Sequence, residues 1–166
     1  MADTCYLFSQ RKPLTSLFAA MTSRRETDVA LTLKPFFLVV DIGFILYWAV
    51  TLLQLIPAAY LFKDYDHPIL VAWNWSFLPL DLFVSATGLG SLYLLRQRNS
   101  AWRSVALISL VLTFCSGLQA LAFWTLRTDF DLLWWLTNGF LLVYPLFFIP
   151  KLLRLEARAP FVTPRP

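Results

Sequence analysis

The sequence predicts an all-α fold: a polytopic membrane protein with a bundle of four transmembrane helices and both termini in the cytoplasm. The first observation behind this prediction is composition. Of 166 residues, 58% are hydrophobic and only 14% are charged, whereas soluble domains are about 25% charged. So few charged side chains cannot cover the surface of a soluble protein. The other two observations are the lengths of the apolar segments and the distribution of Lys and Arg.

Four segments reach the roughly 20 predominantly apolar residues that a helix needs to cross a bilayer. Because lipid cannot hydrogen-bond an exposed backbone, such segments form helices rather than an open sheet. The predicted spans are residues 36–62, 69–95, 102–126 and 132–150. The chain is therefore divided into a polar cytoplasmic tail at 1–35, partly disordered or interfacial, a transmembrane domain at 36–150 and a cytoplasmic C-terminal tail at 151–166.

Basic residues predict the orientation. In a chain with four spans, the N-terminal tail, the loop between the second and third spans and the C-terminal tail share one side. These three regions hold 12 of the 14 Lys and Arg residues, which leaves Lys63 and Arg127 for the other side. The positive-inside rule makes the basic side cytoplasmic. We therefore expect a multi-pass protein of the cell membrane whose partner is the lipid bilayer and whose net charge of +4 does not indicate nucleic acid.

The first span contains Asp41, close to its cytoplasmic end. A charged residue at the bilayer centre costs about 2.5–3.5 kcal/mol on insertion scales, so a carboxyl group in a span needs an explanation. Asp41 either takes part in a binding site or pairs near the interface with Lys34 or Arg96, and the sequence leaves both explanations open. Trp48 falls on the same helical face.

The second span contains Asp81 near its middle, on a stripe of mostly polar or small residues. At about 100° per residue, one face of this helix carries Asn74, Phe77, Asp81, Ser85 and Gly88. That face should contact protein or a cavity rather than lipid. Asp81 is either the centre of a binding site or a packing residue that hydrogen-bonds neighbouring helices.

Pro79 lies two residues before Asp81. Proline lacks a backbone N–H and clashes with the carbonyl four residues earlier, which here belongs to Trp75. We therefore expect a kink between Asn74 and Asp81. A kink and a freed carbonyl beside a carboxyl group favour a polar pocket.

The third and fourth spans add packing and polar groups. Ser109, Thr113 and Gly117 recur every four residues, a pattern that allows close helix packing. If the helices form a simple bundle, polar residues in the outer half converge with Asp81; they are Gln54, Asn74, Gln119 and Asn138. Gln54 and Gln119 are equally compatible with interhelical hydrogen bonds and with ligand contact.

Four tryptophans gather at the outer ends of the second and fourth spans: Trp73, Trp75, Trp134 and Trp135. They form either an aromatic belt at the membrane interface or an aromatic-lined cavity that holds a cationic or sterol-like molecule beside Asp81. The predicted ligand-binding residues are Asp81, Asn74, Gln119, Asn138, Asp41 and Trp75.

The outer loop contains Asp64, Asp66 and His67, the only histidine. Because Pro68 follows, helix capping is favoured here over metal ligation. We expect no metal site and no cofactor. The sequence also contains no nucleophile–base arrangement and no phosphate-binding loop, so the catalytic residues are unknown.

Three segments resemble the YvaD-like proteins, which are small, uncharacterised bacterial integral membrane proteins: "DIGFILYW", "LIPAAYLFKDYDHPILVAWNWSFLPLDL" and "TGLGSLYL". The resemblance covers roughly residues 36–95 and extends more weakly to about 150. It implies a bacterial inner-membrane protein and no particular activity. Four spans with intramembrane acids are also similar in architecture to the emopamil-binding-protein superfamily, although no motif matches residue by residue.

Three functions remain open. The chain binds or moves a small cation, a proton or an apolar ligand at an intramembrane site around Asp81, which we favour. Alternatively it is a membrane-embedded, isomerase-like enzyme that uses Asp81 and Asp41 on a hydrophobic substrate, or a non-catalytic accessory subunit. The two carboxyl groups are expected roughly 13 Å apart along the membrane normal, which disfavours a catalytic pair. A chain this small would transport only as a homodimer.

Overall fold

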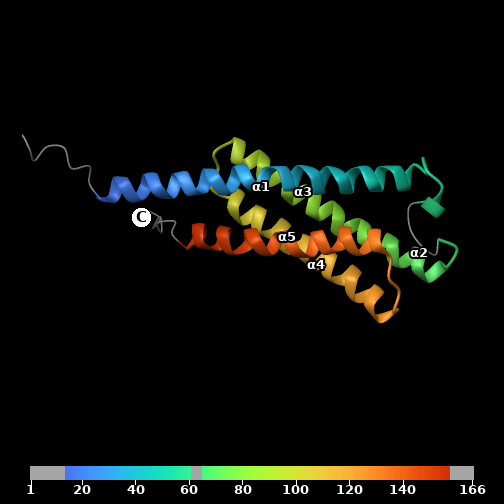
Figure 1. The fold of residues 1–166 in the computed structure, drawn as a ribbon. Helices are drawn as coiled ribbons and strands as arrows, with labels where there is room; N and C mark the ends of the chain where they lie inside the picture. Colours follow the sequence, from blue (N-terminus) through green and yellow to red (C-terminus); the bar gives the residue numbers. More distant parts are fainter. Residues whose placement is uncertain (1–13, 61–64, 158–166) are drawn as a thin grey trace, which may run out of the picture.

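The computed structural model describes residues 14–60 and 65–157, and that part of the chain is entirely helical with no strand (Figure 1). Its elements, in order, are α1 (Leu14–Leu52), the 3-10 turn η1 (Ala58–Tyr60), α2 (Pro68–Trp75), α3 (Phe77–Arg96), α4 (Trp102–Leu126) and α5 (Leu132–Glu156). The prediction of an all-α chain is confirmed.

Four helical segments are long and apolar enough to cross a membrane: Ser23–Leu52, Pro68–Arg96, Trp102–Leu126 and Leu132–Glu156. They match the four predicted spans, with α2 and α3 together forming the second. The start of α1 and the end of α5 lie at the same end of the bundle (Figure 1). An even number of spans places both on one side, and which side that is stays a prediction.

Helix α1 differs most from its predicted bounds. It begins at Leu14 and ends at Leu52, whereas the sequence placed the span at 36–62 and a partly disordered or interfacial tail before it. Part of the expected tail is therefore helical. It continues the helix because Ala30, Leu33 and Phe37, spaced three and four residues apart, are buried in the core.

Helix α1 ends ten residues before the predicted end of the span at residue 62, because a C-terminal capping motif stops it at Leu52. Gln54 adopts a left-handed φ of 50°, and the N–H groups of Gln54 and Leu55 donate to the carbonyls of Thr51 and Val50. This pair of hydrogen bonds is a Schellman motif, which satisfies carbonyls left free at a helix end. The same motif ends α3 and α4, at Arg98 with a φ of 54° and at Thr128 with a φ of 52°.

The predicted kink in the second span is confirmed as a break between α2 and α3 at Ser76. Pro79 cannot donate to the carbonyl of Trp75, so the helical hydrogen bonding stops there. Ser76 closes the end of α2 instead: its N–H donates to the carbonyl of Ala72 at 3.0 Å and its hydroxyl donates to that of Trp73 at 2.6 Å.

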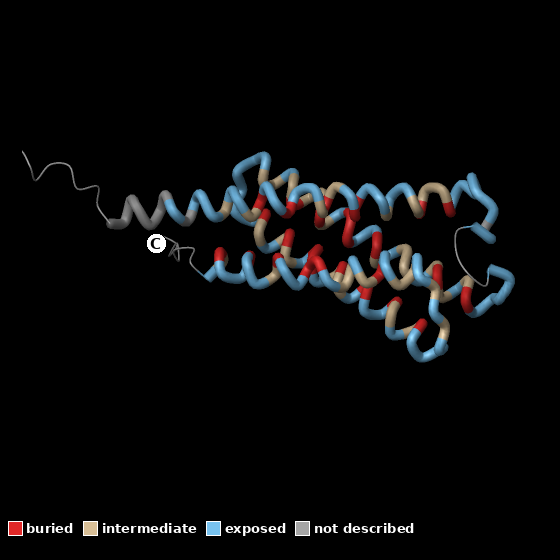
Figure 2. Tube along the Cα trace, in the orientation of Figure 1, coloured by how far each residue is buried: buried red, intermediate tan, exposed pale blue. Residues whose placement is uncertain are grey.

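Helix α4 packs between α3 and α5, and α1 packs chiefly against α3. The predicted ladder of small residues is buried throughout. A Cβ atom at Gly117 would lie 2.7 Å from the backbone oxygen of Asn138 and 2.7 Å from the backbone nitrogen of Leu142, so only glycine allows α4 and α5 to approach this closely. Ser109 donates to the carbonyl of Val84 at 3.2 Å. The buried positions follow the facing sides of the helices (Figure 2).

Candidate ligand-binding site

Asp81 on α3 is 4% exposed and joins three helices. Its Oδ2 accepts a hydrogen bond from Trp48 Nε1 on α1 at 2.9 Å, and its Oδ1 accepts one from Ser116 Oγ on α4 at 3.2 Å. A carboxylate has about four lone-pair positions, so these two donors leave it able to accept further hydrogen bonds. The pairing also explains how a carboxyl group is accommodated inside an apolar bundle.

The side chain of Asp81 lines a cavity of about 670 Å³ in the half of the bundle away from the termini. Ligand pockets typically measure about 300–1,000 Å³. Seven aromatic side chains contribute to the wall: Phe44, Tyr47, Trp48, Tyr60, Trp73, Phe77 and Trp134. The polar residues of the wall are Asp81, Asn74, Ser116, Asp131, Thr137 and Asn138. The wall of the cavity is therefore mostly apolar, with aromatic rings as its largest group, six polar residues and the buried carboxyl group of Asp81 among them.

The polar stripe predicted on the second span faces inward as expected. Asn74, Asp81, Ser85 and Gly88 are buried and Phe77 is half-buried. Ser85 connects α3 to α1 because its hydroxyl lies 3.1 Å from the carbonyl oxygen of Asp41 and 2.9 Å from that of Asp81. The helical periodicity therefore identified the face of α3 on which the site lies.

Asn74 and Asn138, two of the predicted site residues, both line the cavity. The amide of Asn74 and the hydroxyl of Tyr47 lie 3.3 Å apart and exchange hydrogen bonds. Asn138 donates to the carbonyl of Trp134 at 2.9 Å. Both amides are therefore held in place by neighbours and still present polar atoms to the cavity.

Asp41 lies outside the cavity. It is fully buried and packs against Gly88, where a Cβ atom would overlap its Oδ2 and lie 2.7 Å from its Cγ. Neither carboxyl oxygen has a hydrogen-bond partner among the described residues. Of the explanations that the sequence left open for Asp41, pairing with Lys34 or Arg96 is not observed, because the carboxyl group lies in the space left by the absent side chain of Gly88.

Asp41 and Asp81 do not form a pair. Asp41 faces Gly88, which is seven residues beyond Asp81 on α3, a rise of roughly 10 Å. This separation agrees with the expected difference in depth.

Three other expected residues do not reach the cavity. Gln119 is exposed, because it lies two residues, or about 200°, around α4 from the buried Gly117. Gln54 is exposed in the turn after α1. Trp75 is half-buried and packs on Trp48, with ring centroids 5.7 Å apart, so it supports a residue that binds Asp81.

Two of the four tryptophans predicted at the outer ends of the second and fourth spans take part in an aromatic-lined cavity, as one of the two arrangements required. Trp73 and Trp134 line the cavity. Trp73 stacks on Phe123 with centroids 4.0 Å apart. Trp135 instead packs beside Phe130 at 5.3 Å. Trp73 and Trp134 therefore contribute to the cavity wall, whereas Trp135 lies outside it.

Sequence reasoning missed the two donors to Asp81. Trp48 was noted only for sharing a face with Asp41, and Ser116 was not singled out. A signal for Trp48 does exist, because a buried indole N–H usually has a hydrogen-bond partner, and acceptors deep in an apolar bundle are few. Ser116 precedes Gly117, so the ladder of small residues marks its part of α4 as buried.

His67 is the residue that precedes α2, with Pro68 at the first helical position, and its side chain makes no capping hydrogen bond. The helix therefore starts at the expected position, but the expected side-chain cap is absent, and Asp66 lies one residue before the capping position. Asp64 lies outside the described residues. Within residues 14–60 and 65–157, no three His, Cys, Asp or Glu side chains gather as they would around a metal ion.

Four long apolar helices place the chain in the class of multi-pass membrane proteins. Residues 33–159 match a protein family described as a family of unknown function, DUF5360. The chain is 63% identical to a protein of Bacillus subtilis (strain 168) named "Uncharacterized protein YvaD", over 122 residues that make up 74% of this chain and 92% of that protein. The chain therefore belongs to the DUF5360 family, and the resemblance to YvaD-like proteins is confirmed. No solved structure matches it.

Proposed function

We propose that this protein binds a lipophilic organic cation, a molecule with an apolar body and a positively charged amine or onium group, in the cavity beside Asp81. The observation that carries the proposal is the position of a buried carboxyl group in the wall of an aromatic-lined cavity of about 670 Å³. A carboxyl group in a span is costly and commonly marks a ligand or ion site.

The other lining groups match such a ligand. Aromatic faces attract cations within about 6 Å of the ring centroid and also bury apolar surface. Trp48, Trp73 and Trp134 supply indole rings, the best of the aromatic side chains for this contact. The amides of Asn74 and Asn138 provide directed hydrogen bonds, which orient a ligand in a mostly apolar pocket.

Binding is better supported than acid–base catalysis. Acid–base catalysis by Asp41 and Asp81 would require both carboxyl groups to reach one substrate. Asp41 instead packs against Gly88, outside the cavity. A purely structural subunit has no need for a large cavity next to a carboxyl group. The isomerase-like enzyme and the accessory subunit therefore remain second to a binding protein.

We also propose that both termini lie in the cytoplasm of a bacterial cell, so that the cavity lies in the outer half of the cell membrane. The distribution of Lys and Arg supports this orientation. The similarity to a Bacillus subtilis protein supports the bacterial membrane. A homodimer stays a prediction.

Tetraphenylphosphonium is a suitable probe because it is apolar, cationic and small enough for the cavity. We expect it to quench tryptophan fluorescence of the detergent-purified protein with a saturable binding curve. Asp81→Asn should weaken binding by at least tenfold, because it removes the negative charge of the buried carboxyl group in the cavity wall.

Two controls make this test specific. Asp66→Asn removes an exposed carboxyl group at the same end of the bundle and should leave the binding curve unchanged. Tetraphenylborate has the same shape and a negative charge, and it should bind much more weakly than the cation. Equal binding of the two ions, or full binding by the folded Asp81→Asn variant, would rule out the proposed site.

A further inference from the structure

A second, smaller cavity lies at the opposite end of the bundle, between α1 and α5, and measures about 320 Å³. Its lining comes from residues spaced three and four apart on each helix, so one face of α1 meets one face of α5. Helix α1 contributes Arg25, Asp28, Val29 and Thr32, and α5 contributes Lys151, Arg154 and Leu155. We call this cavity the basic groove.

The basic groove has three cationic side chains and one acidic side chain, Asp28. Arg25, Lys151 and Arg154 are all exposed. Within the described part of the chain, no acidic oxygen lies within ion-pair distance of any of the three. Lys151 does contact the ring of Phe148, at 5.2 Å from its centroid. Among the described residues, the three cations therefore share the groove with one acid, Asp28, and form no ion pair.

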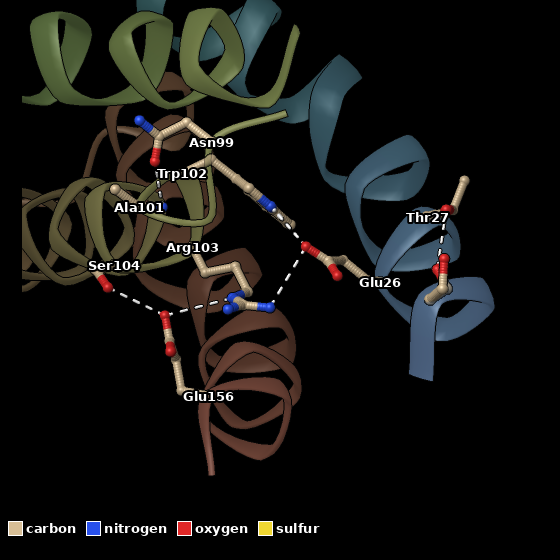
Figure 3. A network of polar contacts seen from close by, with 9 residues as sticks. Glu26, Thr27, Asn99, Ala101, Trp102, Arg103, Ser104 and Glu156 are labelled. Carbon is tan, nitrogen blue, oxygen red and sulfur yellow. Dashed lines mark hydrogen bonds and ion pairs between the residues drawn. The ribbon is translucent and has the colours of Figure 1, made fainter. Parts of the chain in front are cut away.

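A neighbouring network occupies the acids that could have neutralised them. Arg103 on α4 lies between Glu26 and Glu156, with nitrogen–oxygen distances of 3.5 Å to each (Figure 3). Trp102 Nε1 also donates to Glu26 at 2.9 Å, and Ser104 Oγ to Glu156 at 3.0 Å. Glu26 adjoins Arg25 in sequence, and Glu156 lies two residues beyond Arg154. Both glutamates are bound to Arg103, so the network connects α1, α4 and α5, and neither glutamate pairs with an arginine of the groove.

The groove also has an apolar side. Val29 is half-buried and Leu155 is buried, and both line the same cavity as the cations. The groove lies near the start of the candidate span Ser23–Leu52 and near the end of the candidate span Leu132–Glu156. In a bilayer crossed by these spans, that position corresponds to the depth at which lipid headgroups meet acyl chains. Cations beside apolar side chains at this depth match a phospholipid, which carries a phosphate next to apolar chains.

We propose that the basic groove binds the phosphate of an anionic phospholipid from the surrounding bilayer through Arg25, Lys151 and Arg154. Guanidinium groups bind phosphate oxygens with paired hydrogen bonds, and lysine adds a point charge. This site is independent of the cavity beside Asp81, which is lined by other residues at the other end of the bundle.

Native mass spectrometry of the full chain, titrated with phosphatidylglycerol or with phosphatidylcholine of the same acyl chains, tests the proposal. We expect phosphatidylglycerol to bind first and at least tenfold more tightly. Each cation near an anionic lipid contributes about fivefold to affinity, so Arg25→Gln/Arg154→Gln should weaken binding about 25-fold. Asp28→Asn removes the one acid of the groove and should strengthen binding severalfold, a gain that a misfolded protein could not produce.

The control variant Arg24→Gln/Arg98→Gln removes the same charge at exposed positions outside the groove, and it should bind phosphatidylglycerol as the wild type does. An equal loss in this control would reduce the effect to general electrostatics and overturn the site. Equal binding of phosphatidylglycerol and phosphatidylcholine would also overturn the proposed site. Displacement of phosphatidylglycerol by low-millimolar inorganic phosphate would show that the groove takes a soluble anion instead of a lipid.

Discussion

Asp41 and Asp81 are both carboxyl groups inside apolar helices, and their surroundings give them different roles. Asp81 has two donors and faces a cavity. Asp41 has no partner among the described residues and fits into the notch at Gly88. The first arrangement leaves room for a ligand, whereas the second fills the space between two helices.

Gly88→Ala tests the notch. The added methyl group would overlap the carboxyl group of Asp41, and overpacking of this kind costs about 1–3 kcal/mol. We expect a lower melting temperature in detergent, measured by the loss of helical circular dichroism. The double variant Gly88→Ala/Asp41→Ala should recover much of the loss, because shortening Asp41 makes room for the new methyl group.

Gly90→Ala is the matched control for that experiment. Gly90 is on the same helix, a Cβ atom added there would meet nothing within 4 Å, and alanine is the better helix former. Its melting temperature should equal or exceed that of the wild type. If Gly88→Ala melts as Gly90→Ala does, α1 and α3 do not approach as closely as described.

At the scale of helices, the break at Ser76 shapes the cavity. Trp73 and Asn74 on α2 line it together with Phe77 and Asp81 on α3. In one continuous helix, the angle between these side chains around the axis would be set by the rotation of about 100° per residue. The break at Ser76 allows α2 to depart from the axis of α3, and residues on both sides of it form the cavity wall.

Pro79→Ala should join α2 and α3 into one helix, because it restores the N–H that can donate to the carbonyl of Trp75. Spin labels at the exposed positions Ile69 and Tyr93 would be roughly 36 Å apart along a straight helix. We expect a shorter distance in the wild type, a shift toward the straight-helix value in Pro79→Ala, and weaker tetraphenylphosphonium binding. Pro150→Ala on α5 should change neither measurement, and an unchanged distance in Pro79→Ala would mean that proline does not cause the break.

The features that the sequence predicted correctly depend on local spacing. The inward stripe of α3, the kink at Pro79 and the small residues of α4 each follow from residues within one helix. The features that it missed depend on how helices rotate against one another. Gln119 turned outward because Gly117 faces α5, and Trp48 reached Asp81 across 33 positions of sequence. The start of α1 was missed because charged residues such as Arg24 and Arg25 lie on a helix whose other face is buried.

For the whole molecule, the described ends of the chain lie at one end of the bundle (Figure 1). The residues that line the basic groove belong to the parts of α1 and α5 near that end, whereas the residues that line the cavity beside Asp81 lie toward the other. The long helix α1 contributes to both: Arg25 and Val29 line the groove, and Phe44 and Trp48 line the cavity. The proposed orientation would then expose the groove to the inner leaflet and the cavity to the outer half of the membrane.

Cysteine labelling tests that orientation in a background in which Cys5 and Cys115 are replaced by serine. A membrane-impermeant maleimide added to intact cells should label Tyr65→Cys, which precedes α2, and should label Asn99→Cys, between α3 and α4, only after the cells are permeabilised. Both positions are exposed in the structure, so burial cannot prevent reaction. The opposite labelling pattern would invert the topology and place the basic groove outside.

The contact between Asp41 and Gly88 also restricts how this protein can change over evolutionary time. Neither residue contacts a ligand in the proposed site, yet a larger residue at position 88 fits without overlap only where position 41 has become smaller. The order of the two mutations therefore matters, since one path passes through a clashing intermediate and the other through a small void. Among family members we expect the two positions to vary together, with alanine or serine at 88 only where 41 is not an acid.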